Sequence, residues 1–256
     1  MTGHMTLGEL RILAVHGLPE IRPGAALGTL IAGALADAGT PLESGDIVVV
    51  THKVVAKAEN ALVDLASIIP SALASDFARR WNKDPRHIEV VLRQSARIVR
   101  MDRGVIISET RHGFVCANAG VDASNLIGGD VVCLLPKDPD RSAAAIADQI
   151  EETCGLRVPV IVCDTFGRPW REGLTNIAIG VAGLLPLHDY VGKRDSQGRE
   201  LKVTALAVAD ELAGAAELVM GKLDRAPAAV VRGFPYQQGE GTARQLLRKA
   251  EMDMFR

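Results

Sequence analysis

The 256-residue chain has few aromatic side chains, 4% of the total, and no excess of one charge, since 29 Lys and Arg residues balance 31 Asp and Glu residues. A near-neutral charge excludes binding through a broad basic face, which is how most nucleic-acid-binding proteins gain affinity. Scarce aromatics also disfavour platforms on which bases stack. The sequence therefore predicts no nucleic-acid partner, and a core built from Val, Ile, Leu and Ala.

The chain also lacks paired cysteines and long apolar runs. Its four cysteines form no CxxC pair, which favours buried free thiols over zinc ligands or disulfides. No apolar run reaches the ~20 residues that a membrane span needs, and no signal peptide is recognisable. We therefore expect a soluble cytoplasmic protein without membrane contact, in which residues 1–8 form a loose leader. The nucleotide-binding patterns GxxxxGK[ST] and GxGxxG are absent, so any nucleotide would need an unusual scaffold.

The most informative stretch is 158–173, VPVIVCDTFGRPWREG. Its β-branched start predicts a buried strand that stops at Asp164 and Thr165. Ligands gather at the carboxyl ends of such strands, and carboxylate and hydroxyl oxygens suit a hard divalent cation. Arg168 and Arg171 follow and could balance phosphate charge. The alternative is an Asp that caps a loop, followed by two solvated arginines.

Further candidate residues occur elsewhere in the chain. Asp122 lies in the loop-like stretch 118–125 and becomes a metal-ligand candidate if it meets Asp164. Lys53 and Lys57 follow a predicted strand, where they could meet phosphate oxygens or simply be solvated.

The periodicity predicts a mixed α/β fold with no internal repeat or linker. Strand–helix–strand order over 131–162 indicates a right-handed crossover unit. Helix and strand are both possible for 89–101. A helix over 71–81 would have Leu73, Phe77 and Trp81 on one face, and Asp84-Pro85 would end it. Strands are expected over 11–16, 46–50, 104–108, 114–117, 131–135, 158–162 and 227–231, and helices over 25–38, 142–153 and 242–248.

Five blocks in order then carry a resemblance: GLPEIRPG at 17–24, GDIVVVTHKVVAKAEN at 45–60, CANAGVDASN at 116–125, VIVCDTFGRPWREG at 160–173 and VVRGF at 230–234. Together they resemble the gamma-glutamyl ligase family of coenzyme F420 biosynthesis over nearly the whole chain. The resemblance implies one ligase domain over residues 1–256, of unusual mixed α/β fold, that forms an intertwined homodimer. It also implies the stand-alone form, without the C-terminal nitroreductase-like domain of some relatives.

The activity that the resemblance implies is GTP-dependent ligation of L-glutamate to coenzyme F420-0. GTP would convert a carboxylate into an acyl phosphate, which the glutamate amine then attacks. A divalent metal, Mg²⁺ or Mn²⁺, and K⁺ are the implied cofactors. The number of glutamates added stays open. No side chain is needed as a covalent nucleophile, so Arg168 and Arg171 are candidates only for charge stabilisation.

Roles carried over by motif divide into metal and nucleotide contacts. Asp122 and Asp164 would bind one metal ion and Thr165 a second. Lys222 stands where some relatives have a metal-binding amide; since a cation cannot ligate a metal, it is expected to meet a phosphate or to lie outside the site. His52 stands where the family pattern has Ser. The implied GTP contacts are Leu18, Pro19, Glu20, Ile21, His52, Lys57, Asn125, Met220, Gly221 and Lys222.

Two other functions fit the same residues. One is a metal-dependent amide-bond ligase or kinase that uses a different carboxylate substrate. The other is a protein that binds a nucleotide without turning it over.

Overall fold

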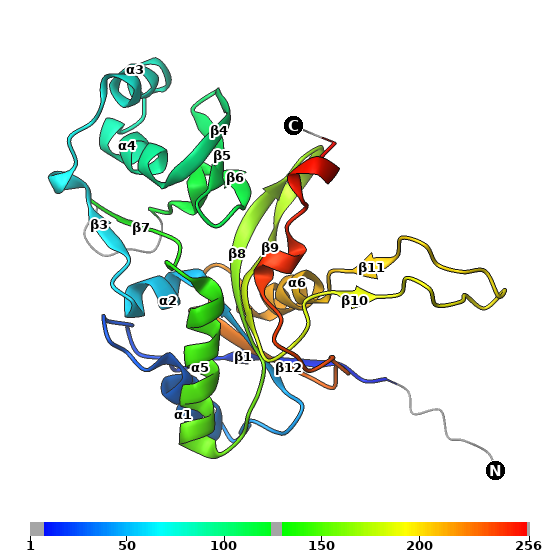
Figure 1. Cartoon of the computed structure of the whole chain (residues 1–256). Helices are drawn as coiled ribbons and strands as arrows, with labels where there is room; N and C mark the ends of the chain where they lie inside the picture. Colours follow the sequence, from blue (N-terminus) through cyan, green and yellow to red (C-terminus); the bar gives the residue numbers. More distant parts are fainter. Residues whose placement is uncertain (1–7, 124–129, 255–256) are drawn as a thin grey trace, which may run out of the picture.

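A five-stranded mixed sheet forms the centre of the computed structural model, which describes residues 8–123 and 130–254 (Figure 1). Its strand order is β1-β12-β2-β8-β9. The five strands are β1 (Arg11–Val15), β2 (Ile47–Thr51), β8 (Val160–Arg168), β9 (Arg171–Ala182) and β12 (Ala228–Arg232). The predicted strands at 11–16, 46–50 and 227–231 are thereby confirmed to within one or two residues, and the mixed α/β class with them.

Three strands of this sheet run in the same direction. β2 and β8 pair in parallel, and β12 is antiparallel to both β1 and β2, so β1 shares the direction of β2 and β8. The crossover unit predicted over 131–162 is wrong. Its first strand, β7 (Val131–Cys133), pairs with β3 (Leu62–Asp64) in a separate two-stranded sheet. The parallel partner of β8 is instead β2, from much earlier in the chain.

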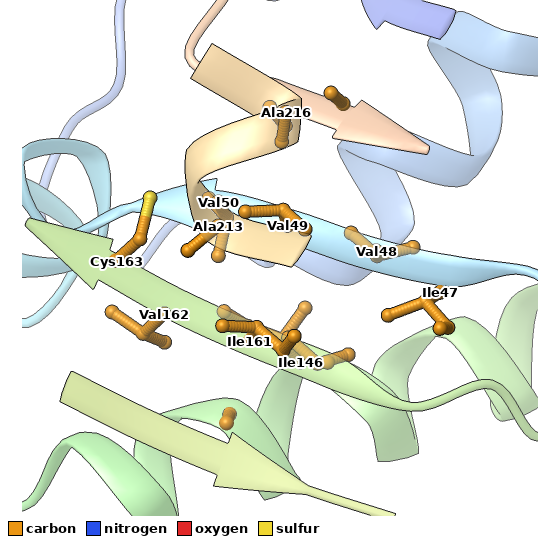
Figure 2. Packing of buried hydrophobic residues seen from close by; sticks show 14 of the residues in the cluster. Ile47, Val48, Val49, Val50, Ile146, Ile161, Val162, Cys163, Ala213 and Ala216 are labelled. Atoms are coloured by element: carbon orange, nitrogen blue, oxygen red, sulfur yellow. The ribbon is translucent and has the colours of Figure 1, made fainter. Parts of the chain in front are cut away.

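Helices cover the sheet and supply most of its apolar partners. α1 (Leu27–Asp37) packs on α5 (Pro139–Cys154), and α5 packs on β8 and β9. α6 (Val208–Met220) packs on β9, β1 and β12. Figure 2 shows Ala213 and Ala216 of α6 beside β2, and Ile146 of α5 close to Ile161 of β8. Helices were predicted over 25–38 and 142–153, and both are confirmed; Gly39 and Gly155 end them with positive φ, as helix C-terminal glycines often do.

The edge strand β9 is held by the helices on either side. Its backbone N–H groups at Ala178 and Val181 donate to Asp210 of α6 and Asp140 of α5, at 2.9 and 2.8 Å. Burial raises the pKa of Asp210. These bonds occupy donors that an edge strand would otherwise expose, so they anchor both helices to the sheet.

A second hydrophobic cluster lies beside the sheet, centred on buried Phe77, Val91 and Ile106. Helix α4 begins at Asp84-Pro85, with the Asp84 side chain as N-cap, so this dipeptide starts a new helix after α3 has ended. The elements here are η1 (Leu65–Ser67), α3 (Ala72–Trp81), α4 (Pro85–Gln94), β4 (Ser95–Asp102), β5 (Val105–Thr110), β6 (Val115–Ala117) and η2 (Asn118–Gly120).

The ambiguous segment 89–101 is part helix and part strand, because α4 passes into β4 at Ser95. The α3 helix is confirmed, but its predicted apolar face is only partly right: Phe77 is buried, whereas Leu73 is exposed. The other strands expected here, 104–108, 114–117 and the first part of 131–135, are confirmed as β5, β6 and β7.

Two further predictions need correction. The strand from 158 does not stop at Asp164 but runs to Arg168 and turns directly into β9. The last predicted helix, 242–248, is a short 3-10 turn, η3 (Ala243–Leu246), with a capping box between Thr242 and Gln245. The remaining elements are α2 (His52–Ala58), which follows β2, then β10 (His188–Asp189) and β11 (Ala205–Leu206) at the base of a projecting arm, and η4 (Ala250–Met252) (Figure 1).

No helix in the described segments has the length and apolar character to cross a bilayer. Of the expected leader, residues 1–8, only Gly8 belongs to the described part of the chain.

Glu89 links α4 to the start of α3 through hydrogen bonds, so the free energy of unfolding should depend on its protonation. Hydrogen bonds from the Ser71 hydroxyl and N–H, together with the Arg93 guanidinium, lower the pKa of Glu89 to about 2. Because the folded-state pKa lies below its ordinary value of 4.5, this stabilisation is complete above pH 4.5 and is lost as pH falls toward 2.

We predict that Glu89→Gln lowers the free energy of unfolding by about 1–2 kcal/mol at pH 7. The variant should also lose part of the acid dependence between about pH 4.5 and 2. Urea unfolding at several pH values measures both effects, with Glu152→Gln on the exposed face of α5 as the matched control. Equal stability of the two variants would contradict the stabilising role of Glu89.

Candidate functional site

A cavity of about 690 Å³ opens at the carboxyl ends of β1 and β2 and beside the middle of β8. This volume is within the range of small-molecule binding sites. Its walls come from the turn after β1, the start of α2 (His52–Ala58), Asp122, strands β8 and β9, and the turn between α6 and β12. Segments that are far apart in the sequence thus meet at the end of the sheet where β1 and β2 have their carboxyl ends, which is where α/β proteins place ligands.

Strand β8 is longer than its parallel partner, and this exposes its polar residues. The last residue pair between β2 and β8 is Thr51 with Cys163. Beyond it, Asp164 and Thr165 still pair with β9, but no other described strand is hydrogen-bonded to them on the opposite side. Because successive side chains of a strand point to opposite faces, Asp164 and Thr165 reach different parts of the cavity wall.

On one face, Asp164 is paired with a buried histidine. His52 Nδ1 lies 3.0 Å from Oδ1 of Asp164, and only 2% of the His52 side chain is exposed. Burial lowers the pKa of His52, but the charge of Asp164 and its hydrogen bond outweigh this and raise the pKa to about 9. The contact with His52 therefore fixes the orientation of Asp164, and the raised pKa favours the charged form of the imidazole.

Asp122 lines the same cavity. Its backbone exchanges both hydrogen bonds with Cys133, at 3.0 and 2.7 Å, and Lys53 Nζ lies 2.7 Å from its Oδ2. The bonds of Asp164 with described residues, from His52 and from the Thr165 N–H, both use Oδ1. Two carboxylates on one cavity wall are a donor set that suits a hard divalent cation.

The described residues contain no set of three or more His, Cys, Asp or Glu side chains that could hold a metal ion. A cation at Asp122 and Asp164 would thus need oxygen ligands from outside this set, such as water or substrate phosphates. Mg²⁺ is commonly held by one or two carboxylates plus phosphates in this way.

A second ion pair lines the cavity one helical turn further along α2. Lys57 Nζ lies 2.7 Å from Oε1 of Glu20 in the turn after β1, and this hydrogen bond lowers the pKa of Glu20. The alternative that Lys53 and Lys57 are merely solvated is wrong, since each is partly buried and paired with a carboxylate at the cavity wall.

On the other face of β8, Thr165 belongs to a polar cluster with Asn176, Glu217 and Lys222. Thr165 Oγ1 donates to Asn176 Oδ1 at 2.6 Å and accepts from Lys222 Nζ at 2.7 Å. Asn176 and Glu217 were not singled out from the sequence. A lone amide in an apolar, Gly- and Ala-rich strand was the available signal for Asn176.

Most of the predicted site residues line this one cavity. Those that do are Leu18, Pro19, Glu20, Ile21, His52, Lys57, Asp122, Asp164, Thr165, Gly221 and Lys222.

Three predicted residues in the described part of the chain do not line it. Met220 is buried in the core with 1% exposed, and Asn125 lies outside the described residues. Arg168 and Arg171 are exposed near the tip of the β8–β9 hairpin, away from the lining, where Arg168 Nη2 donates to the Glu172 carbonyl at 2.7 Å. A role for these arginines in charge stabilisation at the cavity therefore finds no support in this arrangement.

Comparison with known proteins identifies the family. The model of the F420-0:gamma-glutamyl ligase family matches residues 17–233. The chain belongs to this family. The match includes every predicted site residue and every residue that lines the cavity.

Curated relatives in this family match along almost their whole length. The chain is 46% identical over 250 residues to the coenzyme F420:L-glutamate ligase of Methanothermobacter thermautotrophicus, covering 96% of this chain and 99% of the relative. It is 45% identical over 258 residues to the protein of that name in Methanopyrus kandleri, covering 98% and 100%. The like-named protein of Methanocaldococcus jannaschii is 46% identical over 217 residues, covering 84% and 86%.

The His52–Asp164 pair predicts how stability depends on pH in the absence of metal. The folded-state pKa of His52, about 9, exceeds its ordinary value of 6.5. The pair's contribution is therefore complete below pH 6.5 and is lost as pH rises to about 9, on the order of 3 kcal/mol in all.

We expect His52→Gln to remove most of this alkaline loss. Urea unfolding in EDTA, at pH values from 6 to 9.5, measures it against the parent protein. A parent stability that does not fall over this range, or falls equally in the variant, would show that His52 is neutral in the folded state.

Proposed function

We propose that the protein is a GTP-dependent ligase that joins L-glutamate to coenzyme F420-0 in coenzyme F420 biosynthesis. The proposal extends to this chain the ligase activity that its curated relatives carry in their names, and adds GTP as the co-substrate. The number of glutamates that it adds is the first quantity to measure.

One observation about the cavity carries the proposal. Two carboxylates, Asp122 and Asp164, share its wall with the ammonium groups of Lys53, Lys57 and Lys222. Anionic ligands for a divalent cation beside several fixed positive charges form a suitable environment for a nucleoside triphosphate and its metal.

The proposed reaction has two steps. A carboxylate oxygen of F420-0 attacks the γ-phosphorus of GTP, giving an acyl phosphate and GDP. The amine of L-glutamate then attacks the acyl carbon, an amide bond forms, and phosphate leaves as the amine loses a proton. The lysines of α2 are suited to hold phosphate oxygens through both steps, and none of them needs to form a covalent bond to substrate.

A divalent cation, Mg²⁺ or Mn²⁺, fits Asp122 and Asp164. When bound, it would neutralise phosphate charge and polarise the transferred phosphoryl group. His52 keeps Asp164 aligned for this role through the 3.0 Å contact. K⁺, which is implied by the resemblance alone, remains part of the proposal as an activating ion.

We further propose that the whole chain acts as one ligase unit of the family's fold within a homodimer. Several large apolar side chains support an interface between copies, because they are almost fully exposed: Val203 on the projecting arm, and Leu218 and Leu223 near the end of α6, at 91%, 84% and 89%.

Sedimentation equilibrium should give twice the mass of one chain, and a monomer at micromolar concentration would contradict this.

The ligase proposal is tested by mass spectrometry of a reaction that contains protein, GTP, Mg²⁺ or Mn²⁺, L-glutamate and F420-0. We expect mass increments of one or more glutamate residues that require GTP. GTP turnover only with a different carboxylate acceptor would indicate a related ligase or kinase. GTP binding without any turnover would indicate a non-catalytic nucleotide-binding protein.

Asp164→Asn should reduce ligation by about 100-fold or more, because a neutral amide replaces an anionic metal ligand and leaves His52 without its counterion. The matched control is Asp37→Asn, an exposed carboxylate at the end of α1. Circular dichroism checks that both variants fold. Full activity of Asp164→Asn would remove this carboxylate from the proposed metal site.

A further inference from the structure

Four side chains on the α6 side of β8 form a closed ring of polar contacts. Lys222 Nζ lies 2.7 Å from Thr165 Oγ1 and 2.5 Å from Glu217 Oε1. Thr165 Oγ1 donates to Asn176 Oδ1 at 2.6 Å, and Asn176 Nδ2 donates to Glu217 Oε2 at 2.7 Å. Each member thus contacts the next, and the ring returns to its start.

The backbone places all four members of the ring. Thr165 and Asn176 are directly opposite in the β8–β9 register, so their side chains share a face. Glu217 lies in the last turn of α6, and Gly221 turns the chain with a positive φ so that Lys222 follows. The positive φ of 58° at Gly221 disfavours a larger residue at this turn, whose Cβ would also displace the Asp224 carboxylate.

The direction of the hydrogen bonds is fixed by chemistry. A carboxylate only accepts, so the Asn176 amide must present Nδ2 to Glu217 and Oδ1 to Thr165. Asn176 is 2% exposed and has little freedom to turn. The Thr165 proton is therefore committed to Asn176, and its oxygen accepts from the ammonium group.

This arrangement does not fit the second divalent ion that the resemblance assigns to Thr165. Lys222 already places a positive charge 2.7 Å from the hydroxyl oxygen that such an ion would need. A divalent cation at the same oxygen would be repelled by that charge, and Lys222 has no lone pair to offer while it is protonated.

Lys222 has a further N–H donor that is available to a ligand in the cavity. An ammonium group has three N–H donors, and the contacts of Lys222 with described residues occupy two of them. The Lys222 side chain is 56% exposed at the cavity wall, so a phosphate oxygen can reach the third.

We propose that Lys222 is a built-in cation that replaces the second divalent ion, so that each subunit holds one divalent ion and offers the Lys222 ammonium group to a phosphate oxygen of the nucleotide. The nucleotide part of this inference rests on the proposed function, whereas the metal count does not.

The test is a count of bound Mn²⁺ on the full-length protein after removal of metal by chelation. Electron paramagnetic resonance of free Mn²⁺ follows the titration, with and without a non-hydrolysable GTP analogue. We expect one tightly bound ion per subunit in the parent and two in Lys222→Gln, which removes the charge and supplies an amide oxygen. Two ions in the parent, or the same count in both proteins, would overturn the proposal.

Two further variants separate this role from a structural one. Lys222→Met removes the charge without adding a ligand, so it should keep one ion and weaken binding of the GTP analogue by about tenfold. Adding Thr165→Val to Lys222→Gln should return the number of bound Mn²⁺ ions per subunit from two to one. A number that stays at two would overturn the assignment of the second ion to the Thr165 hydroxyl.

Circular dichroism checks that each variant is folded. A protein that binds no GTP analogue would contradict the proposed function, while the Mn²⁺ counts without nucleotide would still decide for or against the replacement of the second ion.

Discussion

The parallel pairing of β2 with β8, and its end at Thr51 and Cys163, is the constraint on which the site depends. Because β8 continues beyond that point, it has the backbone support of one neighbour and an open edge on the other side. Polar side chains can be tolerated there next to a core of fully buried Val and Ile residues. The same extension sends Asp164 and Thr165 to opposite faces, so one strand supplies two separate polar clusters.

Charge pairing makes these clusters possible in a partly buried position. Asp164, Asp122, Glu20 and Glu217 each have a cationic partner: His52, Lys53, Lys57 and Lys222, respectively. Removing one member of such a pair leaves the other uncompensated, which is costly when the pair is shielded from water. The cavity thus holds many charges close together, and a ligand that brings both a metal ion and phosphates can exchange partners with them instead of meeting isolated charges.

The sequence predicted local structure well and long-range structure poorly. The helices over 25–38 and 142–153 were predicted because apolar periodicity is a local property, and each ends at a glycine with positive φ, Gly39 or Gly155. The grouping of Asp164 with Asp122 was also foreseen, from residue types and family resemblance. The partner of β8 was not, because strand pairing depends on contacts far along the chain. The roles of Asn176 and Glu217 were missed for the same reason: they depend on the β8–β9 register and on where α6 packs.

The place of β12 in the sheet has a consequence for how the protein is made. This strand is the last of the sheet in chain order, yet it lies between β1 and β2. During synthesis, β1 has no partner in the sheet until residues 228–232 have left the ribosome, by which time most of the chain is already present. The part of the cavity wall formed by the turn after α6 is also synthesised late. We therefore expect the sheet to close only once β12 is available, with β1 and one side of β2 exposed until then as open edges that chaperones can recognise.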